Sequence, residues 1–133
     1  MADAQPVKLI SWNIGSRVKA RSAQLEWINA EQADVLAFQE VVAAPDLKQR
    51  LSVLGFRHFA STAPTDGRKK LVAIASRDPF RVIKPLAVPH SERAISCSIS
   101  IGGKAAELHC VHVPPGSNYG WLKIEFLDRK SVV

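Results

Sequence analysis

The chain has 133 residues, of which 47% are hydrophobic and 23% charged; these are the proportions of a soluble globular domain and argue against a disordered chain. No apolar run approaches the roughly 20 residues of a membrane span, and residues 1–6 lack the segments of a secretory signal, so we expect a cytoplasmic protein without a membrane span. The formal net charge of +6 favours phosphate-bearing partners such as nucleic acid, although a basic surface can also serve solubility alone.

The N-terminal part predicts a strand, a helix and a second strand. Residues from Val7 to Ile14 are apolar on both faces, as in a central strand, and this strand ends at Asn13. Between Val18 and Gln32, apolar residues recur at helical spacing, and the charged residues, Arg21 among them, are expected to face solvent. Asp34 to Val41 is again strand-like. Alternation puts its side chains on two faces: Leu36, Phe38 and Glu40 on one, and Val35, Ala37 and Gln39 on the other.

A second helix and a series of short strands follow. Pro45 and Asp46 open a helix that Gly55 closes, so that strand and helix alternate as in an α/β protein. We find no repeat or linker and expect one domain or part of one. From Phe56 onward, turn-forming residues separate the expected strands: Phe56–Thr62, Leu71–Arg77, Phe80–Val88, Ala94–Ile101 and Ala105–Val113.

The last two of these strands predict a hairpin that turns at Gly102-Gly103. With a two-residue turn, Cys97 and Cys110 do not oppose one another, so they are not expected to form a disulfide and a reducing compartment fits. The same register places Arg93 opposite His112 at the open end of the hairpin. A guanidinium and an imidazole there could meet a phosphate.

Two strand ends carry oxygen donors. Asn13 ends the first strand and Glu40 the second. An amide and a carboxylate oxygen suit Mg²⁺, a hard ion that keeps several waters, better than they suit zinc. Such a metal would polarise a phosphoryl oxygen. Taken singly, each residue has a plainer interpretation, with Asn13 as a turn residue and Glu40 as a solvated strand end.

Four motifs in order resemble a known family. They are Ser11-Trp12-Asn13-Ile14, the strand from Asp34 to Val41, the segment from Leu71 to Phe80, and the segment from Leu108 to Pro114. From about Val7 to Leu127 the chain resembles the endonuclease/exonuclease/phosphatase superfamily, which includes apurinic endonucleases, pancreatic-type deoxyribonucleases, sphingomyelinases and inositol polyphosphate phosphatases. The ordered set is much more specific than any single motif.

The resemblance implies an α/β fold, namely a four-layer α/β/β/α sandwich of which this chain supplies about half. It implies that Asn13 and Glu40 are metal-site residues, with Mg²⁺ as cofactor and Mn²⁺ as the alternative ion. It also implies that His112 is a catalytic residue that hydrogen-bonds the scissile phosphate; without the resemblance, His112 is an ordinary strand-end histidine. Arg93 and Asn118 are further candidates for substrate binding, although Asn118 could equally cap a helix.

Two segments that the family carries later in its sequence do not occur here. One is Gly-Asp-x-Asn, whose aspartate activates the attacking water, and the other is a terminal Ser-Asp-His. We therefore expect the chain alone to have little or no hydrolase activity, and we expect one sheet to lack its partner and expose an apolar face. Residues 128–133 match what a common sequencing-adapter sequence encodes in one frame. We interpret 1–127 as the N-terminal part of a single domain and 128–133 as a non-native tail.

The leading hypothesis is the N-terminal fragment of a Mg²⁺-dependent phosphodiesterase, and the basic charge favours a nuclease that hydrolyses DNA phosphodiester bonds. A lipid or small-molecule phosphoesterase of the same superfamily is the alternative, because substrate choice resides largely in loops and in the absent half. From a different class, the chain could bind metal and nucleic acid without cleaving, or associate with a complementary chain. The pattern predicts neither endo- or exo-cleavage nor the oligomeric state.

Overall fold

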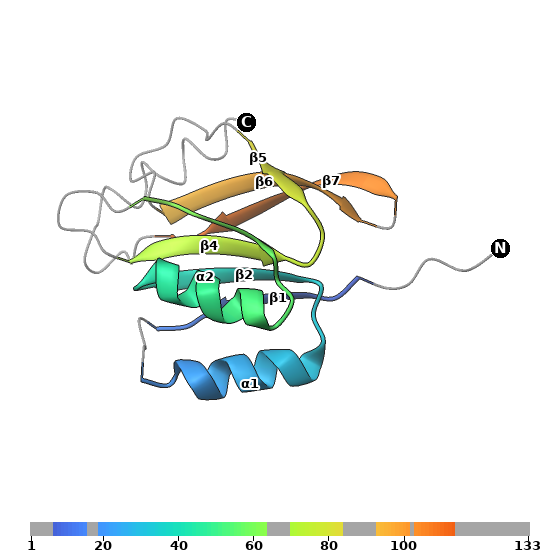
Figure 1. Ribbon diagram of the computed structural model, residues 1–133. Helices are drawn as coiled ribbons and strands as arrows, with labels where there is room; N and C mark the ends of the chain where they lie inside the picture. Colours follow the sequence, from blue (N-terminus) through green and yellow to red (C-terminus); the bar gives the residue numbers. More distant parts are fainter. Residues whose placement is uncertain (1–6, 16–18, 64–69, 84–92, 102, 114–133) are drawn as a thin grey trace.

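A computed structural model describes residues 7–15, 19–63, 70–83, 93–101 and 103–113 (Figure 1). The order of strands and helices agrees with the prediction. Most strands are shorter than predicted, and residues 84–88 of one predicted strand lie outside the described residues. No helix of the described part is long and apolar enough to cross a membrane. The elements are β1 Leu9–Asn13, α1 Arg21–Glu31, β2 Val35–Val41, α2 Ala44–Val53, β3 His58–Ser61, β4 Leu71–Ser76, β5 Phe80–Val82, β6 Ala94–Ile101 and β7 Lys104–Val111.

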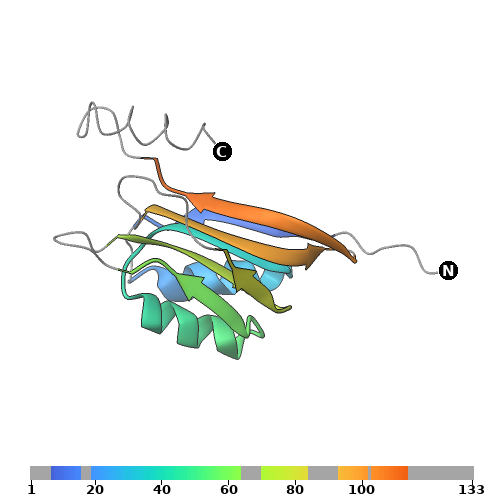
Figure 2. The same ribbon diagram turned by 90° about the horizontal axis from the view of Figure 1, so that it is seen from above.

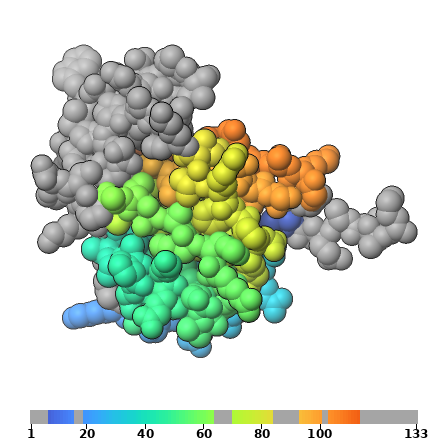
Figure 3. All heavy atoms as spheres, turned by 45° about the horizontal axis from the view of Figure 1, so that its top comes forward, coloured from blue at the N-terminus to red at the C-terminus, as the bar shows by residue number. Residues whose placement is uncertain are grey.

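The strands form two sheets. One has the order β1-β2-β4-β3, in which β1 and β2 are parallel and the other pairs antiparallel; the other has the antiparallel order β5-β6-β7. Both helices lie on one face of the first sheet, and the second sheet lies on its other face (Figures 1 and 2). In the space-filling view, the yellow residues of β4 and β5 adjoin the orange residues of the β6–β7 hairpin (Figure 3). The described chain therefore forms three layers, α/β/β.

The first sheet is covered on both faces by the chain itself. Leu36 and Phe38 of β2 face the helices and pack with a cluster that includes Leu51 of α2. Val35 and Ala37 face the second sheet. The expectation that one sheet would lack its partner is wrong for the described residues, because the hairpin folds back over β2 and β4 and buries their inner side chains. The hairpin's contribution to this inner core is Ile95, Cys97, Ile99 and Cys110, all buried.

The hairpin register agrees with the prediction from a two-residue turn. Cys97 pairs with Leu108 and Cys110 pairs with Ile95, and both cysteines are free and buried. Burial raises the pKa of both thiols, which therefore stay protonated. Gly103 has a φ of +81°, the left-handed conformation that such a tight turn requires.

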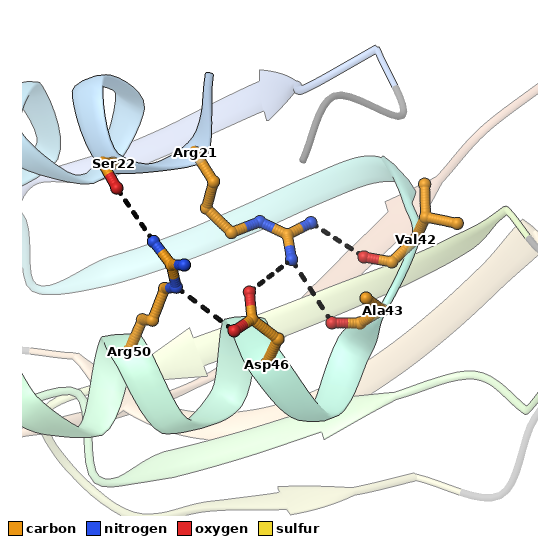
Figure 4. A network of polar contacts seen from close by, with 6 residues as sticks. All are labelled: Arg21, Ser22, Val42, Ala43, Asp46 and Arg50. Atoms are coloured by element: carbon orange, nitrogen blue, oxygen red, sulfur yellow. Dashed lines mark hydrogen bonds and ion pairs between the residues drawn. The ribbon is translucent and has the colours of Figure 1, made fainter. Parts of the chain in front are cut away.

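Arg21 corrects a prediction, because it is fully buried rather than exposed to solvent. Its Nη1 donates to Asp46 Oδ2 at 2.9 Å, and its Nη2 donates to the carbonyl of Val42 at 2.7 Å (Figure 4). The side chain leaves the first turn of α1 and reaches the N-terminus of α2, where carbonyl and carboxylate oxygens accept hydrogen bonds from both Nη groups. Helical periodicity identifies charged positions but not acceptors about 25 residues away, so it could not predict this burial.

Gly55, directly after α2, offers a test of the local packing. Its φ is +98°, and a Cβ there would lie 2.6 Å from Arg77 Nη1. Arg77 cannot yield easily, because it donates to the carbonyls of Leu54 and Ala33 at 2.9 Å each. We expect Gly55→Ala to lower the free energy of unfolding by about 2–3 kcal/mol, as measured by urea denaturation.

The matched control for that substitution is Gly103→Ala. Gly103 also has a positive φ, but a Cβ there would meet nothing within 4 Å. Gly103→Ala should therefore lower the free energy of unfolding only by the cost of a left-handed backbone conformation, about 1 kcal/mol. Equal losses at Gly55 and Gly103 would show that Arg77 does not constrain the position.

Candidate active site

The carboxyl ends of β1 and β2 lie side by side. The two strands are parallel, Asn13 is paired with Gln39, and the amide of Ile14 donates to the carbonyl of Gln39 at 3.1 Å. Asn13 Oδ1 accepts a hydrogen bond from the amide of Gly15 at 2.9 Å, so this side chain also closes the turn after β1. Its amide oxygen has a second lone pair, which remains available to a ligand.

Glu40 lies in an irregular part of β2. Its φ is +55°, and the pairing between β2 and β4 shifts register between Phe38 and Val41. The prediction that Glu40 shares a face with Phe38 is wrong, because this bulge interrupts the alternation of side chains. Glu40 Oε1 lies 3.6 Å from Nε2 of His112, which follows β7 in the other sheet. A positive φ at a residue other than glycine is strained and is concentrated at functional sites.

His112 and Arg93 meet at the open end of the hairpin, as the register predicts. The amide of His112 donates to the carbonyl of Arg93 at 2.8 Å, and Arg93 Nη1 lies 2.9 Å from His112 Nδ1. Arg93 is 7% exposed and the His112 side chain 17% exposed. The structure thus brings His112, Arg93 and Glu40 together at one end of the interface between the sheets.

The surroundings of His112 favour its neutral form. Burial lowers the pKa of His112, and the positive charge of Arg93 lowers it further; Glu40 acts in the opposite direction, and Lys70 adds a smaller lowering. A neutral imidazole has one donor and one acceptor nitrogen. At neutral pH His112 can therefore hydrogen-bond a ligand without itself carrying a charge.

Gln39 immediately precedes Glu40 in β2, and it was not among the site residues predicted from the sequence. Its Nε2 lies 3.3 Å from Ser11 Oγ and 3.3 Å from Cys110 Sγ, so one amide joins β1, β2 and β7. Cys110 Sγ in turn donates to the carbonyl of Phe38 at 3.4 Å. Strand alternation predicts that Gln39 shares a face with Val35 and Ala37, and this pattern was the sequence feature that could have identified it.

The oxygen donors at these strand ends are of the kind that Mg²⁺ prefers. The described residues contain no group of three or more His, Cys, Asp or Glu side chains that could hold a metal, so a closed zinc site is not formed by them. One carboxylate and one amide oxygen, from Glu40 and Asn13, are the small set of hard ligands with which Mg²⁺ binds while it keeps several waters. Asn118 lies outside the described residues.

Known proteins match both the sequence and the fold. The profile of the Endonuclease/Exonuclease/phosphatase family matches residues 10–129. A search of curated proteins finds no significant match. An AP endonuclease from Archaeoglobus fulgidus has a TM-score of 0.71 and 22% identity, covering 94% of this chain and 49% of that chain. D. rerio TDP2 complexed with single strand DNA product has a TM-score of 0.68 and 14% identity, covering 92% of this chain and 52% of that chain.

A family protein from Leptotrichia buccalis is also similar, with a TM-score of 0.57 and 15% identity, covering 94% of this chain and 61% of that chain. The chain thus spans 49% to 61% of the length of these three structures. The three layers α/β/β belong to a four-layer α/β/β/α sandwich, of which the chain supplies about half by length. This confirms the predicted fold class. With a profile match over residues 10–129 and a fold that agrees, the chain belongs to the endonuclease/exonuclease/phosphatase family.

Proposed function

We propose that the chain is the N-terminal part of a metal-dependent phosphodiesterase domain that hydrolyses DNA phosphodiester bonds. In this proposal Asn13 and Glu40 hold Mg²⁺, with Mn²⁺ as an alternative, and His112 hydrogen-bonds the scissile phosphate. Arg93 adds positive charge beside His112, and Asn118 is a further candidate to contact substrate. When bound, the metal would supply Lewis-acid polarisation of a phosphoryl oxygen.

The observation that supports the proposal is that Glu40, His112 and Arg93, which come from separate strands, lie together. Asn13 and Glu40 come from the ends of the paired strands β1 and β2, and His112 comes from the other sheet to within 3.6 Å of Glu40. A strand bulge with a strained residue is needed to bring Glu40 there. Strain retained at such a point is typical of a functional site and is not required for a solvated strand end.

DNA is the proposed substrate on two grounds. The net charge of +6 favours a polyanion, and one similar structure is a complex with single strand DNA product. A lipid or small-molecule phosphoesterase remains the second candidate, because the same donors would serve any phosphodiester.

We further propose that residues 1–127 are part of one domain that continues in the natural protein, with 128–133 a non-native tail. The chain lacks the family's Gly-Asp-x-Asn and Ser-Asp-His segments, and with them the expected general base. The 133-residue chain should therefore show little hydrolysis by itself. Two results together would favour the non-catalytic alternative. The stop codon after Val133 would be verified in the source DNA, and the 133-residue chain would bind metal and nucleic acid without cleaving it.

The test begins by sequencing the source DNA beyond the codon for Leu127, with a primer in independent flanking sequence. The protein encoded by the uninterrupted reading frame is then expressed and assayed. We expect cleavage of labelled single- or double-stranded oligodeoxynucleotides that stops when the metal is chelated and resumes with Mg²⁺. His112→Ala should reduce kcat by about 10²-fold to 10³-fold, the usual effect of removing one transition-state hydrogen-bond donor.

The matched control is His109→Ala, because His109 lies on the other face of β7 and its side chain is 43% exposed. It should leave kcat unchanged. Cleavage that persists in a chelator, or equal losses at both histidines, would contradict the proposed site. Turnover of sphingomyelin vesicles or inositol polyphosphates without turnover of DNA would favour the second candidate.

A further inference from the structure

The contact between Arg93 and His112 determines which ring nitrogen of the histidine carries a proton. Arg93 Nη1 lies 2.9 Å from His112 Nδ1. A guanidinium only donates hydrogen bonds and keeps its charge at any ordinary pH, so Nδ1 must be the acceptor. In the neutral imidazole the proton then resides on Nε2, which is the nitrogen that lies 3.6 Å from Glu40 Oε1.

The surrounding backbone holds this pair in place. The amide of His112 donates to the carbonyl of Arg93 at 2.8 Å, which extends the β6–β7 ladder by one pair, and both residues are largely shielded from solvent. His109 of β7 provides a contrast. Its Nδ1 lies 2.6 Å from Ser96 Oγ, and a hydroxyl can donate or accept, so that contact selects neither tautomer.

We propose that Arg93 is a positioning residue that holds His112 in the tautomer with its proton on Nε2, so that His112 presents a hydrogen-bond donor beside Glu40. This proposal rests on the proposed function only for the identity of the ligand, a phosphodiester oxygen. Such an oxygen carries negative charge and only accepts, and it therefore matches an N–H donor. A protonated Nε2 cannot take a proton from water, so His112 is not the general base of the reaction.

The role differs from a direct clamp on the substrate phosphate. Arg93 is 7% exposed and its Nη1 lies against the imidazole, so this contact acts on a ligand through His112. Its charge also opposes protonation of the ring, since an imidazolium would place an N–H against the guanidinium. Replacing Arg93 should thus change the state of the His112 ring even when no substrate or metal is present.

The test is long-range ¹H–¹⁵N NMR of the imidazole rings in the ¹⁵N-labelled chain at about pH 8, above the ordinary histidine pKa of about 6.5. His112→Gln identifies the His112 signals by their loss. We expect Nδ1 of His112 to show the shift of an unprotonated ring nitrogen and Nε2 that of a protonated one. A protonated Nδ1 in the unmodified chain would overturn the proposal, whatever the variants do.

Two variants measure the part played by Arg93. Arg93→Met should move both nitrogen shifts toward the averaged values of exchanging tautomers, whereas Arg93→Lys, which keeps a donor, should retain most of the unmodified pattern. Arg81→Met is the control, since Arg81 is exposed on β5 of the same sheet and should leave the His112 signals unchanged. Unaltered His112 shifts in Arg93→Met would contradict the role of Arg93. Because no metal or substrate is used, failure here is separate from failure of the phosphodiesterase proposal.

Discussion

Replacing Arg21 by Met should lower the free energy of unfolding by about 3 kcal/mol. Arg21 is fully buried, and its guanidinium binds Asp46 and the carbonyls of Val42 and Ala43 (Figure 4). Methionine fills much of the volume of the side chain but leaves these oxygens without their donor, and each hydrogen bond to a charged group typically contributes about 1.5–3 kcal/mol. Urea denaturation followed by circular dichroism measures the difference.

Arg50→Met is the matched control for that substitution. Arg50 binds the same carboxylate, with its Nε 3.2 Å from Asp46 Oδ1, but its side chain is 41% exposed. An exposed pair at this helical spacing contributes only about 0.3–0.5 kcal/mol. Similar losses at Arg21 and Arg50 would show that burial of Arg21 is not what stabilises the junction between the helices.

The same network should make stability depend on pH. The hydrogen bond from Arg21 lowers the pKa of Asp46. Desolvation raises it by less, and the hydrogen bond from Arg50 lowers it further. A carboxyl whose pKa is lowered by folding stabilises the fold above its unfolded pKa, about 3.9, and loses that contribution as the pH falls through its folded pKa. The stability difference between the unmodified chain and Arg21→Met should therefore shrink below about pH 4. A difference that stays constant down to about pH 2 would contradict the ion pair.

Glu40→Gln should weaken the binding of Mn²⁺ to this chain by at least about tenfold, because even the loss of an outer partner of a metal ligand costs about 10-fold to 100-fold in affinity. Glutamine preserves the size of the side chain but removes the charge that attracts a hard cation. Isothermal titration calorimetry measures the affinity. Glu107→Gln, at an exposed position of β7, should leave it unchanged. Equal affinities in the unmodified chain and Glu40→Gln would remove Glu40 from the metal site.

The hairpin shows what the sequence can predict well. A turn of two glycines sets the register of β6 against β7, and that register correctly separated Cys97 from Cys110 and brought Arg93 to His112. Such predictions succeed because register in a hairpin is a local property of the turn. The pairing of Asn13 with the end of β2 could also be predicted, because consecutive parallel strands joined by a helix end at the same edge of a sheet.

The position of the Glu40 carboxylate shows why other features could not be predicted. The bulge and the positive φ occur at an ordinary glutamate, with no glycine to mark them, so alternation put the side chain on the helix side. The burial of Arg21 depends likewise on acceptors from a later helix. Both features follow from tertiary contacts that local periodicity does not contain.

The most direct test of the proposed metal site is paramagnetic broadening of the amide NMR signals of this chain by Mn²⁺. The account predicts that broadening begins at Asn13, Glu40 and His112, is reversed by excess Mg²⁺, and disappears in Glu40→Gln while it persists in Glu107→Gln. Broadening centred elsewhere, or unaffected by Glu40→Gln, would show that these strand ends do not form the metal site.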